Sequence, residues 1–178
     1  MLVRVHIGVS VDGFVATPDG RPALLSMPDF VPGESYGHQE FSAQCAAVVM
    51  GRTTFEPALG APRWPWPGKE VNVLTSRALP PESAAQGAVA ATDGPAALLE
   101  RLRAADLDGD VQLLGGPRTI QAFRALGAID RLELIVLPIL LGDGLPLFPS
   151  GGSPLPLRLL DRRVFPDGAV ELDYELNS

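Results

Sequence analysis

Hydrophobic and polar residues alternate at the start of the chain. From residue 3 to residue 9, Val or Ile at every odd position alternates with Arg4, His6 and Gly8. This period of two is typical of a strand with one buried face, so we expect a strand over residues 2–9. Residues 10–16 then run into the turn signal Pro18-Asp19-Gly20, which predicts a loop over one edge of the sheet.

Two continuous apolar runs end in glycine. Residues 46–50 precede Gly51, and residues 111–114 precede Gly115-Gly116. Apolar residues on both faces are typical of a strand inside a parallel sheet. The residues after each glycine fit a helix, the first limited by Pro57 and the second ended by Gly127. We therefore expect the same strand–glycine–helix unit twice.

The pattern changes near residue 129. Before that point, strands are predicted over 70–74 and 89–91, a short helix within 34–44, and a longer helix that Asp93 caps. After it, residues 131–137, 157–165 and 169–176 have the pattern of strands, with no helix between them. This order predicts an α/β fold in one domain over residues 1–178, with a mostly parallel central sheet, helices on both faces and an antiparallel C-terminal edge.

Composition narrows the class of protein. A length of 178 residues suits one domain, and a net charge of −7 disfavours binding to nucleic acid. The start of the chain lacks the plan of a secretory signal, and the apolar stretch 134–141 is too short to span a bilayer. We expect a cytoplasmic protein with no membrane partner.

The cysteine and histidine content excludes two kinds of site. Cys45 is the only cysteine, so an intrachain disulfide is excluded and a buried structural role is expected. His6 and His38 are the only histidines, and with one cysteine they do not make a usual zinc site. We therefore expect no metal.

The two glycine-led turns suit a phosphate. Glycine lets the backbone approach the anion, and the N–H groups of a helix start favour it. Arg52, Thr53 and Thr54 add a cation and two hydroxyls, and Thr75-Ser76-Arg77 repeats this chemistry after the next strand. Two cationic clusters favour NADPH, with its extra 2′-phosphate, over NADH. Alternatively, the arginines are solvated and the hydroxyls cap local backbone.

These segments together resemble a known family. The string Val48-Val49-Met50-Gly51-Arg52-Thr53-Thr54-Phe55-Glu56, followed by residues 73–77 and by Leu113-Leu114-Gly115-Gly116, is similar to the dihydrofolate reductase superfamily. Residues 10–16 and 136–148 resemble its riboflavin-biosynthesis branch, the RibD C-terminal-like reductase domain that usually follows a deaminase domain. The resemblance covers almost the whole chain and implies a dihydrofolate-reductase-like fold in a stand-alone member.

The resemblance implies an NADPH cradle. The first glycine turn would serve the cofactor phosphates, and the second, whose peptide bond is often cis in the superfamily, would lie under the pyrophosphate. The residues implied are Gly51, Arg52, Thr53 and Thr54 for the phosphates, Thr75, Ser76 and Arg77 for the adenosine 2′-phosphate, Gly115, Gly116, Arg118 and Thr119 for the pyrophosphate, and Gly8, Val15 and Ala16 near the nicotinamide.

The resemblance also implies an activity on a small-molecule substrate. The expected reaction is reduction by NADPH of the pyrimidine 5-amino-6-(5-phosphoribosylamino)uracil, or of a related small heterocycle or carbonyl compound. A folate reductase and a non-catalytic NADP-binding module are the alternatives. Members of this branch often pair through their late strands, so a homodimer is expected.

Two carboxylates are the catalytic candidates. Folate-reducing relatives place an acidic residue before the Met-Gly-Arg strand, and by spacing it corresponds to Glu34, with Asp29 as the alternative. In the riboflavin branch the Ser-x-Asp-Gly segment borders the cleft, which favours Asp12. Each also has a structural interpretation, Glu34 as a surface carboxylate and Asp12 as a turn residue before Gly13.

Overall fold

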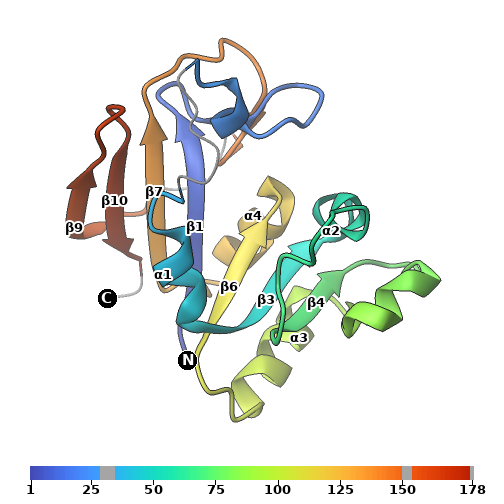
Figure 1. Ribbon diagram of the computed structural model, residues 1–178. Coiled ribbons are helices and arrows are strands. Elements are labelled where there is room, and N and C mark those ends of the chain that lie inside the picture. The colour runs from blue at the N-terminus through green and yellow to red at the C-terminus, as the bar shows by residue number, and fades with distance from the viewer. Residues whose placement is uncertain (29–34, 150–153, 177–178) are drawn as a thin grey trace.

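The strands of the chain build one eight-stranded sheet in the order β5-β4-β3-β6-β1-β7-β10-β9 (Figure 1). The structure is a computed structural model that describes residues 1–28, 35–149 and 154–176. Six neighbouring strands are parallel, and the last two run antiparallel at one edge, as the sequence predicts. The parallel strands are β1 (Val3–Ser10), β3 (Cys45–Gly51), β4 (Glu70–Leu74), β5 (Ala88–Ala91), β6 (Asp110–Gly115) and β7 (Arg131–Leu137), and the antiparallel edge is β9 (Arg158–Val164) and β10 (Val170–Glu175).

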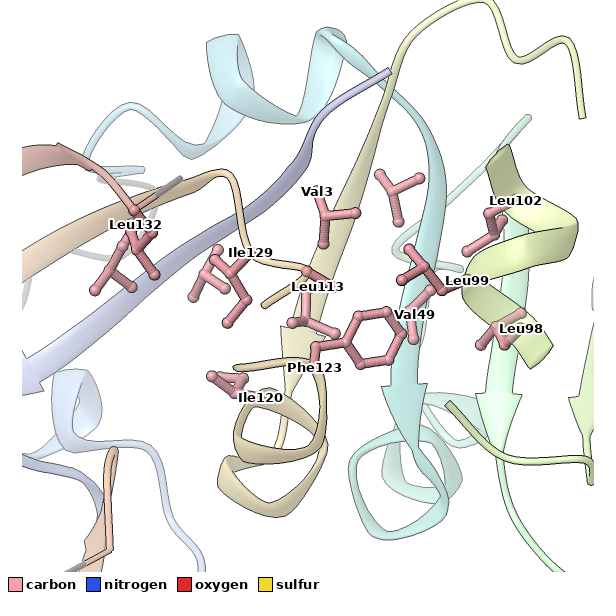
Figure 2. Packing of buried hydrophobic residues seen from close by; sticks show 14 of the residues in the cluster. Val3, Val49, Leu98, Leu99, Leu102, Leu113, Ile120, Phe123, Ile129 and Leu132 are labelled. Carbon is pink, nitrogen blue, oxygen red and sulfur yellow. The ribbon is translucent and has the colours of Figure 1, made fainter. Parts of the chain in front are cut away.

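Helices cover both faces of this sheet. Leu98 and Leu102 of α3 and Phe123 of α4 pack against Val49 and Leu113 on one face, which forms the largest core (Figure 2). On the other face, alternate strand residues pack under α2 and α1. Truncation of a buried ring such as Phe123 costs about 3–5 kcal/mol of stability in other cores. The helices are α1 (His38–Ala43), α2 (Arg52–Leu59), α3 (Pro95–Ala104) and α4 (Pro117–Ala125), with short 3₁₀ turns at Ala23–Ser26 and Pro81–Gln86.

The segment predicted as a loop after β1 contains a strand. β2 (Phe14–Ala16) pairs antiparallel with β8 (Leu145–Pro146) in a separate two-stranded sheet. A turn closed by Gly13 N–H to the Ser10 carbonyl, with Gly13 at φ +91°, reverses the chain before β2. The partner strand lies far along the chain, so no local pattern predicts this pair.

Two helix boundaries differ from the sequence prediction. Pro57 does not limit α2, which continues two residues further to Leu59 although proline has no N–H for the helical ladder. Asp93 does not cap α3: Gly94 is the N-cap and makes no side-chain bond there. The carboxylate of Asp93 instead forms an ion pair with Arg101.

Cys45 is buried at the start of β3, as expected of a structural cysteine. Burial raises the pKa of its thiol to about 11. Such a thiol stays protonated at neutral pH, and only the thiolate is strongly nucleophilic. Within the described parts of the chain, the helices are all too short or too polar to cross a membrane.

Candidate functional site

The two glycine-led turns lie side by side at the carboxyl ends of neighbouring strands. β3 and β6 are parallel, and their last pairing joins Met50 to Gly115. Gly51 is the N-cap of α2 and Gly116 the N-cap of α4, and neither helix has a side-chain cap bond. Because the first N–H groups of a helix have no helical partner, the start of α2 offers donors to an anion. The start of α4 offers fewer, since Pro117 has no N–H and the N–H of Thr119 donates to the Gly116 carbonyl.

Each glycine of this pair of turns is needed for a different reason. Gly115 has φ +116°, a conformation that residues with a Cβ rarely adopt, and its peptide bond to Gly116 is cis. Gly51 has ordinary extended angles, but a Cβ there would lie 2.9 Å from Oγ1 of Thr119. A Cβ on Gly116 would meet Oγ1 of Thr54 at 3.5 Å. The threonine of each helix therefore packs against the glycine that opens the other.

A cavity of about 830 Å³, which we call the Arg118 cavity, opens in front of these turns. Arg118 is exposed there, and it forms no hydrogen bond or ion pair with any other residue that the structure describes. Asp19 is the acidic side chain in the lining of this cavity, and the hydrogen bond from Thr17 lowers its pKa. The predicted residues that line this cavity are Gly51, Arg52, Thr53, Gly116, Arg118 and Thr119.

Arg52 connects α2 to the turn that follows β4. Its Nε donates to Oε1 of Glu56 at 2.6 Å, and its Nη1 donates to the carbonyl of Ala78 at 2.7 Å. Oγ1 of Thr75 accepts from the N–H of Arg77 at 3.2 Å, the local capping that was the alternative interpretation of this segment. Thr75, Ser76 and Arg77 line neither this cavity nor the next one. The structure thus brings Arg52, rather than these three side chains, to the cavity wall.

A second cavity of about 590 Å³, which we call the His38 cavity, adjoins the first. The two share the wall formed by Gly116, Pro117, Thr53, Gly20 and Leu145. The His38 cavity brings together Gly8, Val15 and Ala16, the residues predicted to lie near the nicotinamide. Thr54, from the first glycine turn, lines the same cavity.

His6 and His38 line this second cavity, which sequence reasoning missed. Nε2 of His6 lies 3.1 Å from the Tyr36 carbonyl, and the ring stacks on Phe41. The imidazole of His38 forms no hydrogen bond to the described residues. The signal was present in the sequence, since His6 lies two positions before Gly8 and therefore on the same face of the strand.

Burial keeps both imidazoles neutral at pH 7. Desolvation, with a smaller effect of His38, lowers the pKa of His6 to about 4. Desolvation, and then the charge of Lys69, also lowers the pKa of His38. The His38 cavity therefore carries no positive charge from its histidines under ordinary conditions.

The lowered pKa of His6 predicts a loss of stability in acid. The unfolded chain binds a proton near its ordinary pKa of 6.5 while the folded chain stays neutral to about 4, so acid favours unfolding. Between about pH 7 and pH 4 this linkage amounts to about 3 kcal/mol. His6→Gln, whose Nε2 can still donate to the Tyr36 carbonyl, should reduce the acid-dependent loss of unfolding free energy by that amount in denaturant titrations. An unchanged pH dependence would show that His6 is not buried in its neutral form.

His6 also belongs to a group with metal-like spacing. One atom each of His6, Glu133 and Glu171 lie within 4.8 Å of one another. Arg4 donates to Glu133 and Arg163 to Glu171, so both carboxylates already face cations. Nε2 of His6 must carry hydrogen to bond a carbonyl, so it offers no lone pair. The group is better described as an ion-pair network.

Asp12, one of the two catalytic candidates, lies outside both cavities. Its carboxylate accepts from the hydroxyl of Ser10 at 2.6 Å and from the N–H groups of Leu141 and Gly142. The bond from Ser10 and then that from Gly142 lower its pKa, which is unfavourable for a proton donor. The geometry favours its alternative role as a turn residue. Glu34, the other candidate, and Asp29 lie outside the described residues.

Comparisons with known proteins agree with this architecture. The family model described as RibD C-terminal domain matches residues 1–170. "Uncharacterized protein YwjB" of Bacillus subtilis is 29% identical over 171 residues, which cover 96% of this chain and 95% of that protein.

Solved structures show the same fold. A "Putative riboflavin biosynthesis protein" from Shewanella sp. PV-4 superposes with a TM-score of 0.85 at 27% identity, over 98% of both chains. A diaminohydroxyphosphoribosylaminopyrimidine deaminase/5-amino-6-(5-phosphoribosylamino)uracil reductase from Thermotoga maritima has a TM-score of 0.71 at 18% identity, over 98% of this chain and 56% of that one.

Proposed function

This chain belongs to the RibD C-terminal domain family, and we propose that it is an NADPH-dependent reductase of a small heterocyclic or carbonyl compound. The observation that carries the proposal is the pair of cavities that meet at Gly116. One has phosphate-binding chemistry and the other is mainly apolar and electrically neutral. This is the division that a dinucleotide and its reducible partner require.

The residues of the Arg118 cavity fit the phosphates of NADPH. The uncapped start of α2 supplies N–H donors, and the lack of a Cβ on Gly51 and Gly116 lets Thr119 and Thr54 pack closely against the two turns. Arg118 would contact the pyrophosphate. Arg52 reaches the turn after β4, where the family resemblance puts the 2′-phosphate.

The chemistry of the reaction divides between cofactor and protein. Bound NADPH supplies a hydride to an electrophilic carbon. Gly8 and Leu137 lie in the wall of the His38 cavity, where the reacting rings would meet. Proximity supplies much of the rate in such reactions. The imidazole of His38 has no hydrogen bond to another described residue, and it is our candidate to hold the proton that the reduced substrate requires.

A titration with NADPH followed by nicotinamide fluorescence tests the proposal. We expect saturable binding and then oxidation of NADPH when 5-amino-6-(5-phosphoribosylamino)uracil, other heterocycles or simple carbonyl compounds are added. Binding without oxidation of any candidate would favour a non-catalytic NADP-binding module. Failure to bind NADPH would contradict both proposals, and oxidation by dihydrofolate alone would favour a folate reductase.

Arg52 and Arg118 should distinguish the two nicotinamide cofactors. Arg118→Ala should weaken NADPH and NADH alike, by about tenfold, because both carry a pyrophosphate and a charged hydrogen bond contributes about 1.5–3 kcal/mol. Arg52→Ala should weaken NADPH more than NADH, because only NADPH carries the 2′-phosphate. The measurement is the Kd of each cofactor by fluorescence titration at fixed ionic strength.

Arg124 provides the matched control on α4. Its guanidinium stacks over Phe148 and lines neither cavity. Arg124→Ala should therefore leave both Kd values unchanged. Equal weakening of NADPH and NADH by Arg52→Ala would mean that Arg52 does not recognise the 2′-phosphate.

A further inference from the structure

The distribution of cations over the two cavities is unequal. All 14 Lys and Arg residues of the chain fall within the described ranges, because residues 29–34, 150–153 and 177–178 contain none. Arg52 and Arg118 line the Arg118 cavity. Among the described residues, the lining of the His38 cavity contains no Lys or Arg, and no Asp or Glu either.

Cations near the His38 cavity are held by other groups. The guanidinium of Arg21 donates to the carbonyl of Leu25. Lys69 donates to the carbonyls of Ser42 and Cys45, both at 2.5 Å. Movement of either side chain toward the cavity would first break these hydrogen bonds.

The remaining wall of the His38 cavity is apolar or neutral. Leu24, Ile135 and Leu137 form apolar surface, and the polar groups are the hydroxyls and imidazoles of Ser35, Tyr36, Thr53, Thr54, His6 and His38. Transfer of an anion from water to such a wall loses hydration without gaining a counter-charge. Phosphate recognition is therefore confined to the cofactor half of the site.

We infer that the substrate is an uncharged, planar carbonyl or imine compound, and that a phosphate on it weakens its binding to this cavity. This inference rests on the proposed reductase function. It selects, among the substrates that the family resemblance implies, the small heterocycle or carbonyl compound over the phosphoribosylated pyrimidine. Because the imidazole of His38 has no hydrogen bond to the described residues, it is our candidate to hydrogen-bond the carbonyl or imine end.

Matched pairs of probes test this inference on the NADPH complex. The pairs are 5-amino-6-(ribosylamino)uracil with and without its 5-phosphate, and benzaldehyde with 4-carboxybenzaldehyde. In each pair we expect the member without phosphate or carboxylate to have a kcat/KM, or an affinity for the NADPH complex, about tenfold higher. A charged member that is equal or better would overturn the inference, and so would failure of every probe to bind at millimolar concentration. Failure to bind NADPH in the preceding titration would instead contradict the proposed function.

A cation added to the cavity provides the converse test. Ser35→Lys should raise the affinity for the phosphorylated or carboxylated member of each pair by about tenfold. Ser35→Met, of similar length and without charge, is the matched control and should leave the ratio within each pair unchanged. If Ser35→Lys gave no gain while the variant remained folded and bound NADPH, a cation would already serve this cavity and the inference would be wrong.

Discussion

Replacement of His38 by Phe will lower kcat by about 10²–10⁴-fold, the usual contribution of a positioned proton donor. The ring at this position packs near His6 and Phe41, with centroids 5.5 and 6.0 Å away. Phe preserves this aromatic packing while it removes the N–H. NADPH affinity should change little, because the residues proposed to bind its phosphates line the neighbouring Arg118 cavity. Stopped-flow NADPH oxidation with a neutral carbonyl substrate gives the measurement.

The pH profile separates proton donation from a structural role of His38. An acid catalyst is active in its protonated form, and the pKa of His38 lies below its ordinary value of 6.5 because of burial and of Lys69. In the wild type, kcat should therefore rise as the pH is lowered from about 8 to about 5.5. His38→Gln keeps a hydrogen-bond donor without a titratable group, so it should retain KM and lose this slope. Retention of the slope in His38→Phe would assign the proton to another donor.

Local patterns in the sequence predict the parts of the fold that depend on neighbouring residues. The alternation in β1 predicts which residues lie on each face of the strand. Val3 lies on the face that packs in the core, and His6 on the face that lines the His38 cavity. The glycines after β3 and β6 mark the helix starts, because a buried strand followed by glycine is a local signal. These elements include most of the wall of the Arg118 cavity.

The remaining features depend on residues far apart in the chain. β2 pairs with β8, and Asp12 binds the N–H groups of Leu141 and Gly142. Neither partner can be identified from the segment itself, so residues 14–16 are predicted as a loop, and the sequence leaves Asp12 open between a catalytic and a turn role. His38 begins a helix of six residues with weak periodicity, and only its neighbours in space indicate its function.

Gly51→Ala will lower the free energy of unfolding by about 1–3 kcal/mol, the usual cost of overpacking a filled site. The new Cβ would lie 2.9 Å from Oγ1 of Thr119, which is buried and β-branched and therefore has few alternative rotamers. The start of α2 must then move away from that of α4. Because both helix starts face the same cavity, NADPH affinity should also fall. We expect a loss of about tenfold or more, the size of one lost charge-assisted hydrogen bond.

Removal of the opposing hydroxyl should reverse this loss. Gly51→Ala with Thr119→Ala leaves no Oγ1 to clash with the new Cβ, so the double variant should be more stable than Gly51→Ala alone, whereas Thr119→Ala alone should have a small effect. Gly115→Ala is the contrasting case. Its cost comes from φ +116°, and the nearest side chain, Ile120, is 3.5 Å from the added Cβ, so Ile120→Val should not restore it. If Ile120→Val rescued Gly115→Ala while Thr119→Ala failed to rescue Gly51→Ala, the steric constraint would lie at Gly115 and the conformational one at Gly51, the opposite of what we expect.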